Sequence, residues 1–339
     1  MLTPAFWWKR KGLAALLLAP LGLLYGAITA RRMHRPGGAE PPLPLICVGN
    51  FVAGGAGKTP TAIALAHSAR SVGLDPCFLT RGHGGHLKGP VLVNIDRHTA
   101  HEVGDEALLL ARVAPTVVAR RRADAFSLLR ATGTDLCIMD DGFQNPSVKK
   151  TFSFVVVDGA VGVGNGLPIP AGPLRAPLRR QMLLADAIII YGDSIGGQRI
   201  VRTAAKAGKP IFRAKLIANA PPAAPHRRLY AFAGIGRPEK FFRSLEDEGY
   251  RLAARRAFAD HYPYRFSDLT RLLDEADMLD AVPVTTEKDA VRLPRGIVGS
   301  NWSRSRVAVF GVHTRFSEEQ AVGSLLLDIR KRWMARHFS

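Results

Sequence analysis

The sequence predicts an α/β protein: a mostly parallel sheet with helices on both faces, a second, smaller α/β domain, and an N-terminal membrane helix. Strand-like and helix-like stretches alternate through most of the chain, as they do where helices connect parallel strands. A glycine-rich loop follows the first strand, and an uncharged apolar stretch precedes it. With 339 residues and 47% hydrophobic content, the chain can bury a large core in two domains.

The first element is an apolar stretch over residues 12–30 that contains no charged residue. As a helix it would be about 28 Å long, close to the thickness of a bilayer's hydrocarbon core. Aromatic and basic residues that suit lipid headgroups flank it: Phe6, Trp7, Trp8, Lys9, Arg10 and Lys11 before it, and Arg31, Arg32 and Arg35 after it. These features predict a membrane-associated helix within residues 1–35 and disfavour the alternative, a cleaved signal peptide. Because both flanks are basic, the sequence leaves open whether the helix spans the bilayer or lies in its interface.

The second element is LICVGNFVAGGAGKTP from Leu45, an apolar strand that enters a glycine-rich loop. Glycines let successive backbone N–H groups point at phosphate oxygens, a lysine adds positive charge, and a threonine hydroxyl can ligate Mg²⁺. The predicted phosphate-binding residues are Gly54, Gly55, Ala56, Gly57, Lys58 and Thr59. The usual pattern has a glycine where this chain has Val52, so a simple glycine-rich turn is the alternative. Helix-like residues at 61–68 favour the phosphate site, a bound nucleoside triphosphate and a P-loop NTPase-type sheet.

The rest of the chain continues the alternation. Strands are expected at residues 77–80, 91–95, 116–119, 152–157, 187–191 and 210–214, and helices at 107–113 and 123–131. Proline-rich residues at 36–44 and 218–225 are predicted linkers. The chain therefore divides into a membrane-associated helix at 1–35, a P-loop core at 36–217 and a smaller α/β domain at 218–339. Strands near Val284 and Val307 and a helix from Glu318 belong to the last domain.

A second chemical signal is LCIMDDGFQ from Leu136, an apolar strand that ends in Asp140 and Asp141. The carboxyl ends of parallel strands share one edge of a sheet, so these carboxylates are expected near the phosphate loop, where they can hold the Mg²⁺ of a nucleotide. Strands also end in Asp for turn chemistry, which is the alternative. The upstream loop favours the metal-binding interpretation.

A third signal is Asp105 in VGDEALLLA, at the start of a predicted helix. Asp105 follows the phosphate loop by one strand–helix step, so it can lie on the same sheet edge and take a proton from an attacking hydroxyl. The alternative is an N-cap. His261 in FADHYPY could support Asp105, although a lone histidine is usually structural. Sequence spacing does not bring the two residues together.

The formal net charge of +19 suits either nucleic acid or an anionic membrane or substrate. The basic residues are scattered, without an RNA-binding signature or zinc-finger spacing, so we expect no nucleic-acid partner. Cys47, Cys77 and Cys137 lie far apart without a CxxC pair. This pattern predicts reduced, buried cysteines in a cytosolic environment.

The chain resembles the tetraacyldisaccharide 4′-kinase family, the lipid A 4′-kinases of Gram-negative bacteria, over nearly its whole length. The motifs that carry the resemblance are VGNFVAGGAGKTP from Val48, TRGHGG from Thr80, VGDEALLLA from Val103, DDGFQ from Asp140, GNGLPIPAGPLRAP from Gly164, AFAGIGRPEKFF from Ala231, FADHYPY from Phe258 and TTEKDAVRL from Thr285. The paired glycines Gly54 and Gly55, without a glycine at Val52, are also what this family looks like.

The resemblance implies an ATP-dependent kinase of lipid A (lipopolysaccharide) biosynthesis at the cytoplasmic face of the cell inner membrane. Its acceptor would be the 4′-hydroxyl of a tetraacylated glucosamine disaccharide 1-phosphate, the lipid A disaccharide precursor. ATP, Mg²⁺ and inner-membrane lipid are the other implied partners, and no obligate protein partner is inferred.

The resemblance also implies roles for individual residues. Lys58 would contact the β- and γ-phosphates, and Asp105 and His261 would form the catalytic pair. Thr59 and the pair Asp140 and Asp141 would hold Mg²⁺. Arg175 in GPLRAP is a predicted substrate or phosphate contact, with a surface arginine as the alternative. Many members have a glutamate where this chain has Ala176, which puts any role of that glutamate in doubt here.

Two other functions remain open from the sequence. One is a P-loop ATPase of the partitioning or metallocentre-assembly type, which offers no reason for the membrane helix; a partitioning ATPase would also normally have a lysine at Ala53. The other is a non-enzymatic, membrane-tethered protein that binds nucleotide or nucleic acid through its charge.

Overall fold

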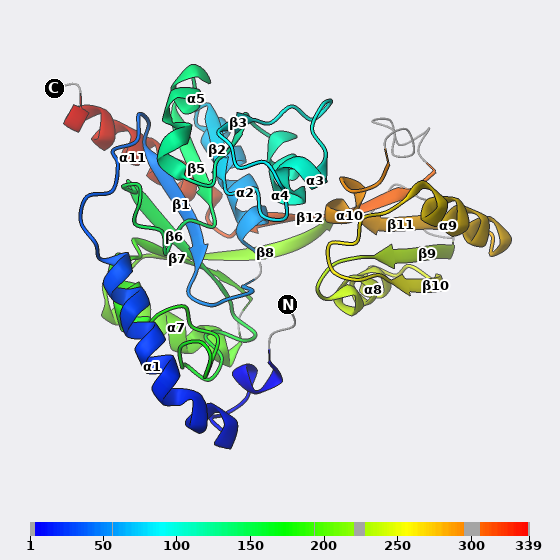
Figure 1. Ribbon diagram of the computed structural model, residues 1–339, viewed down its shortest axis with the longest axis horizontal. Helices are drawn as coiled ribbons and strands as arrows, with labels where there is room; N and C mark the ends of the chain where they lie inside the picture. The colour runs from blue at the N-terminus through cyan, green and yellow to red at the C-terminus, as the bar shows by residue number, and fades with distance from the viewer. Residues whose placement is uncertain (1–3, 56, 193, 220–227, 295–305, 338–339) are drawn as a thin grey trace.

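The computed structural model describes residues 4–55, 57–192, 194–219, 228–294 and 306–337. Their strands form one twelve-stranded sheet in the order β10-β9-β11-β12-β8-β7-β6-β1-β5-β2-β4-β3. Figure 1 shows two lobes connected by the long strands β8 and β12. We call the part around β1 to β7 the first lobe and the part around β9 to β11 the second lobe. The predicted α/β class with a mostly parallel sheet is confirmed.

The first lobe contains the central strands of the sheet. They are β1 (Leu45–Asn50), β2 (Pro76–Thr80), β3 (Val91–Leu92), β4 (Thr116–Val118), β5 (Leu136–Asp140), β6 (Phe152–Asp158) and β7 (Ala187–Tyr191). All six residues of β1 are buried, as expected for the middle of a sheet covered on both faces. The strands pair in parallel except for β3, which runs antiparallel to β4 at the edge.

Helices cover both faces of the first lobe. The helices after α1 are α2 (Lys58–Ser71), α3 (Ala100–Val103), α4 (Asp105–Ala111), η2 (Arg122–Ala125), α5 (Phe126–Ala131), α6 (Leu178–Leu184), α7 (Ile195–Lys206) and α11 (Glu319–His337). Because strand side chains alternate, Leu45 and Cys47 join a core with α5, α6 and α7, whereas Ile46 and Val48 join a core with α2 and α11. The predicted helices on both faces are therefore present.

The second lobe repeats this layered arrangement on a smaller scale. Its elements are β9 (Arg228–Ala233), α8 (Pro238–Asp247), β10 (Leu252–Ala257), α9 (Phe266–Met278), β11 (Ala281–Thr286) and α10 (Glu287–Ala290). Leucines of α9 pack on one face of these parallel strands, and Phe241, Phe242 and Leu245 of α8 pack on the other.

The lobes are joined by β8 (Ile211–Asn219) and β12 (Ala308–Phe316), which pair antiparallel from Ala214–Phe316 to Asn219–Gly311. β8 is parallel to β7 of the first lobe, and β12 is parallel to β11 of the second. The two parallel sets therefore run in opposite directions. Each set pairs with the first residues of its joining strand, so the carboxyl edges of the two sets face each other along β8 and β12 (Figure 1).

The N-terminal part consists of η1 (Ala5–Trp8) and α1 (Leu13–Met33). A face of small residues packs α1 on the body: a Cβ at Gly22 would lie 2.7 Å from the Pro168 oxygen, and one at Gly26 would lie 2.8 Å from the Pro168 ring. The other faces expose large apolar side chains: Leu13, Leu16, Leu17, Leu21, Leu23, Leu24, Tyr25 and Ile28. By length and composition, α1 is long and apolar enough to cross a membrane.

Several elements differ from the sequence-based expectation. The strand expected at 91–95 is only Val91–Leu92, and the helix expected at 107–113 is Asp105–Ala111. The amphipathic helix α7 was not predicted. Residues 218 and 219 of the expected linker belong to β8, and residues 220–225 lie outside the described residues. The division at residue 218 stays a prediction; α11, which follows it, packs on α2 of the first lobe.

The three cysteines are free and buried, as predicted. Cys47 lies in β1, and burial raises the pKa of its thiol to about 12. Cys77 and Cys137 occupy paired positions of β2 and β5. They contribute apolar volume to the core of the first lobe.

Candidate active site

The predicted phosphate loop connects the buried end of β1 to the first residue of α2. Gly57 caps the helix with a φ of 89°, a left-handed conformation that favours glycine. Gly55 lies against Asn50, where an added Cβ would be 2.6 Å from the Asn50 Cγ. The Asn50 amide in turn donates to the Val156 carbonyl at 2.7 Å. The loop thus presents its backbone at the N-terminus of α2, an arrangement that binds anions; Ala56 lies outside the described residues.

The two carboxylates predicted to hold metal lie beside this loop. β5 pairs in parallel with β1, with Asp140 opposite Val48. The Thr59 hydroxyl donates to Asp140 Oδ2 at 2.9 Å, and Lys58 Nζ lies 3.3 Å from Asp141 Oδ2. The other carboxylate oxygens, Asp140 Oδ1 and Asp141 Oδ1, are buried without a hydrogen-bond partner in the part of the chain that the structure describes. Hard oxygen donors that lack partners fit Mg²⁺.

The two carboxylates differ in their affinity for a proton. Burial, and then the nearby Glu106 carboxylate, raises the pKa of Asp140 to about 7. Burial also raises the pKa of Asp141, but the cations Lys58 and Arg175 more than offset it, so this pKa lies below its usual value. A bound divalent cation would favour the ionised form of both groups.

The second cluster joins Asp105 of the first lobe to His261 of the second. Asp105 is the first residue of α4, only 3% of its surface is exposed, and its Oδ1 accepts from the Glu106 N–H at 3.0 Å. Gly104 is the N-cap residue, so the N-cap role considered for Asp105 falls to its neighbour. The His261 Nδ1 lies 3.2 Å from Asp105 Oδ2. Two motifs that are 156 residues apart (261 − 105 = 156) in the sequence therefore meet at one point.

The Asp105 and His261 contact stabilises charge on both groups. Burial raises the pKa of Asp105, but His261, Lys288 and Arg292 more than offset this effect and leave the pKa below its usual value. The Asp105 carboxylate raises the pKa of His261 against the effect of burial. Asp105 is therefore ionised at neutral pH and able to accept a proton.

Arg175 lies next to the phosphate loop. Its backbone N–H donates to the Phe51 carbonyl at 2.9 Å, and its Nη2 is 3.6 Å from Asp141 Oδ2. The side chain is partly buried and lies beside the carboxylates, so its position agrees with the predicted phosphate or substrate contact, which stays a prediction. Ala176 is fully buried in the apolar core and has no side-chain oxygen in the place of a glutamate carboxylate.

Sequence reasoning missed two residues of this region, Gln144 and Lys288. Gln144 donates to the Asn50 carbonyl at 2.7 Å and accepts from Arg175 at 3.2 Å, so it braces the loop against the arginine. Lys288, from the second lobe, donates to Glu106 at 2.8 Å. Both lie inside motifs already noted, DDGFQ and TTEKDAVRL, but their partners are remote in sequence.

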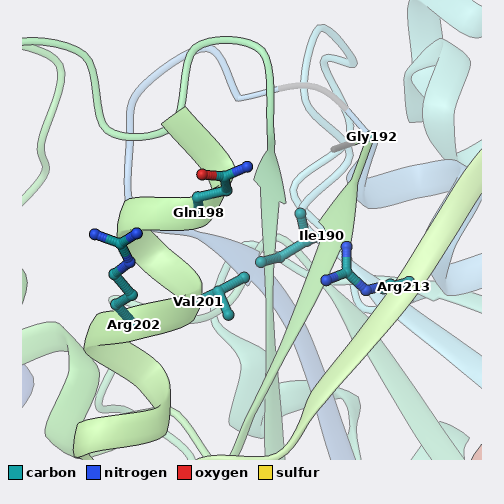
Figure 2. Close-up of a pocket in the computed structure, with 7 residues that line it drawn as sticks. Ile190, Gly192, Gln198, Val201, Arg202 and Arg213 are labelled. Carbon is teal, nitrogen blue, oxygen red and sulfur yellow. The ribbon is translucent and has the colours of Figure 1, made fainter. Parts of the chain in front are cut away.

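A small pocket of about 170 Å³ lies apart from these groups, between α7 and the strands β7 and β8 (Figure 2). It is lined by Ile190, Gly192, Gly197, Gln198, Val201, Arg202 and Arg213. Its volume is below that of ordinary cofactor pockets, and its lining includes none of the predicted site residues. This pocket is therefore separate from the phosphate loop and from the carboxylates beside it.

The sheet, the loop at the N-terminus of α2 and the carboxylates at the end of β5 define a P-loop NTPase-type protein. A family model described as Tetraacyldisaccharide-1-P 4′-kinase matches residues 14–331. The chain belongs to the tetraacyldisaccharide 4′-kinase family. The partitioning and metallocentre-assembly ATPases considered from the sequence are different families.

Curated relatives and a solved structure agree with this assignment. The chain is 51% identical over 320 residues to a Tetraacyldisaccharide 4′-kinase of Methylorubrum extorquens, covering 94% of this chain and 96% of that protein. It is 46% identical over 330 residues to one from Bradyrhizobium sp., covering 96% and 97%. The crystal structure of LpxK from Aquifex aeolicus in complex with ATP has the same fold, with a TM-score of 0.73 and 23% identity over 94% of this chain and 99% of that one.

We predict that Gly57→Ala weakens ATP binding by about tenfold or more, because a side chain is disfavoured in the left-handed conformation. The new Cβ would also lie 3.1 Å from the Tyr191 ring. Equilibrium binding of a fluorescent ATP analogue measures the effect. Gly37→Ala is the matched control, since Gly37 has a φ of 91° with open space around it. Equal affinities for ATP in the two variants would contradict the predicted role of this loop.

Proposed function

We propose that the chain transfers the γ-phosphate of ATP to the 4′-hydroxyl of a tetraacylated glucosamine disaccharide 1-phosphate, a step of lipid A biosynthesis. The observation that carries this proposal is the contact between Asp105 and His261, a buried carboxylate paired with an imidazole from the opposite lobe. Such a pair suits the removal of a proton from an acceptor hydroxyl. The names of the closely similar relatives support the same acceptor.

In the proposed mechanism, the backbone of the phosphate loop and the Lys58 ammonium hold the β- and γ-phosphates. Thr59, Asp140 and Asp141 would hold Mg²⁺, which neutralises charge on the phosphates when bound. Asp105 accepts the proton of the sugar 4′-hydroxyl while the oxygen of that hydroxyl forms a bond to the γ-phosphorus. The bond between that phosphorus and the bridging oxygen breaks, and ADP leaves. His261 stabilises the Asp105 carboxylate in the orientation that receives the proton.

We also propose that the protein works at the cytoplasmic face of the inner membrane, where ATP is available. Each acyl CH₂ removed from a bilayer costs about 0.8 kcal/mol, so an acceptor with several acyl chains stays in the lipid. The exposed leucines of α1 and the basic residues before it, Lys9, Arg10 and Lys11, suit contact with an anionic bilayer. Anionic lipid would thus be the partner of these basic residues.

Incubation of the full-length protein with γ-labelled ATP and the disaccharide lipid in mixed micelles tests the function. We expect the label to move to the lipid and that transfer to stop when EDTA removes Mg²⁺. A glucosamine disaccharide 1-phosphate that lacks its 4′-hydroxyl is the control acceptor. ATP hydrolysis without labelled lipid would refute the kinase assignment.

We predict that Asp105→Asn lowers turnover by about a hundredfold or more, because the amide cannot accept the hydroxyl proton. Binding of ATP should persist, since Asp105 lies outside the phosphate loop. The same transfer assay and the ATP-binding assay measure the two effects. Asp96→Asn, at an exposed loop position of the first lobe, serves as the control. Unchanged turnover in Asp105→Asn would leave this residue with a purely structural role.

We predict that a Leu17→Gln and Leu24→Gln double variant binds anionic vesicles about tenfold or more weakly, because both side chains are exposed on α1 and lose apolar contact with lipid. Vesicle sedimentation measures this binding. The residual binding should fall with added salt, as expected of basic residues on anionic lipid. Leu92→Gln, an exposed leucine on β3, is the control. Vesicle binding equal to that of the control would exclude α1 as the lipid contact.

A further inference from the structure

Arg292 lies at the meeting point of the two lobes and contacts several parts of the second one. Its side chain is nearly fully buried. The guanidinium donates to the carbonyls of Lys288 and Gly234, both at 3.0 Å, and of Tyr262 at 3.4 Å, and it pairs with Asp289 at 3.1 Å. A planar group with five fixed donors suits such a set of acceptors better than a lysine does.

Asp289, the partner of Arg292, is itself fully buried and holds the same loops. It accepts from the Gly234 N–H and the Tyr264 hydroxyl, each at 2.8 Å, and from the Thr286 hydroxyl at 2.6 Å. These bonds compensate its charge, so the ion pair with Arg292 is well satisfied. The end of β9 and the segment after β10 are therefore tied to α10.

This network fixes the backbone that presents His261. The His261 N–H donates to the Gly234 carbonyl at 2.9 Å, the same oxygen that accepts from Arg292. His261 has a φ of 59°, a left-handed conformation that a non-glycine residue adopts only with support from its surroundings. Tyr262, the next residue, also accepts from Arg292. Arg292 thus bonds both to the Gly234 carbonyl, which accepts from the His261 N–H, and to the carbonyl of the residue after His261.

Arg292 also faces the first lobe. Its Nε lies 3.8 Å from Asp105 Oδ2, the oxygen that His261 approaches to 3.2 Å. The ion pair between Lys288 and Glu106 docks α10 onto the start of α4 and so fixes this approach. A cation at such a distance stabilises an ionised carboxylate.

The other charges around this point are accounted for. Asp105 is faced by His261, Lys288 and Arg292, with Glu106 beside it and already paired with Lys288. His261 is faced in turn by Asp260, 3.8 Å from its Nε2, and by the His83 ring at a centroid distance of 6.0 Å. Two of these groups, Lys288 and Arg292, stay cationic over the working range of pH, because, against the effect of burial, the Glu106 carboxylate raises the pKa of Lys288 and a guanidinium does not lose its proton. Of the two, Arg292 bonds directly to the backbone that carries His261.

We propose that Arg292 is a positioning residue of phosphate transfer: it fixes the loop that presents His261 and places a permanent positive charge beside the Asp105 carboxylate. The proposal rests on the proposed function of Asp105 as the base. The guanidinium acts on the reaction through two other side chains and does not touch the acceptor. Geometry and charge are separable contributions, because a lysine retains the charge and a glutamine retains part of the hydrogen bonding.

The test compares Arg292→Gln and Arg292→Lys in the full-length protein, with Arg251→Gln at an exposed position of the second lobe as the control. The lipid transfer assay gives kcat and KM for ATP over a range of pH, and thermal unfolding reports folding. For Arg292→Gln we expect kcat to fall about tenfold from misplacement of His261. We expect the acidic limb of its kcat profile to move to higher pH, because loss of a cation raises the pKa of Asp105.

For Arg292→Lys we expect a lower kcat, because an ammonium cannot make all the guanidinium's bonds to the backbone carbonyls. The acidic limb should stay at its original pH, because the positive charge remains. The KM for ATP should stay unchanged in both variants, because the phosphate loop is not involved. A fall in kcat that parallels a loss of folded protein, or an acidic limb that stays in place in Arg292→Gln, would overturn the proposal. Full turnover in Asp105→Asn would refute the proposed role of Asp105 as the base. The Asp105 variant and the Arg292 variants therefore test the two proposals separately.

Discussion

The antiparallel pairing of β8 with β12 is the constraint on which the rest of this structure depends. A parallel sheet that continued in one direction would place the loops of both lobes along the same edge. Here the direction reverses between Ala214–Phe316 and Asn219–Gly311, so the carboxyl edges of the two parallel sets face each other. The phosphate loop, Asp140 and Asp105 lie on one of these edges, and His261 and Arg292 lie on the other. The site between them is a consequence of this reversal.

The charges at these facing edges are divided according to the chemistry proposed for them. Asp140 is buried, one of its oxygens has no hydrogen-bond partner among the described residues, and its pKa is raised. An isolated negative charge is costly at such a position, whereas a divalent cation would compensate it. Asp105 is equally buried but surrounded by cationic groups, so it is held ionised without a metal. The same residue type therefore has two different affinities for a proton within one site, because the neighbours differ.

The N-terminal helix combines two faces that serve different surroundings. Glycines at 22 and 26 allow close approach to Pro168 and the loop that continues to Arg175, which itself bonds to the phosphate loop. Large leucines cover the remaining faces and have no protein to pack on in the described part of the chain. One loop, from Pro168 to Arg175, therefore contacts both the apolar helix α1 and the phosphate loop.

Local patterns in the sequence determined a large part of this protein. Glycine spacing predicted the phosphate loop, because glycine adopts its left-handed turn most readily, and an apolar strand ending in two acids predicted Asp140 and Asp141 beside it. The apolar stretch predicted α1, and alternation predicted the covered parallel sheet. These features depend on interactions between residues close in sequence, or on the period of a helix or strand, and both can be read directly.

What only the tertiary structure decided are the contacts between remote segments. The sequence placed Asp105 and His261 in separate motifs and left an N-cap as the alternative for Asp105; their 3.2 Å contact required the reversal at β8 and β12. Gln144, Lys288 and Arg292 carried no separate signal, since their partners are fixed by packing and not by spacing. The physical reason is that sequence periodicity fixes which face of an element is buried, whereas which buried faces meet depends on the pairing of whole strands.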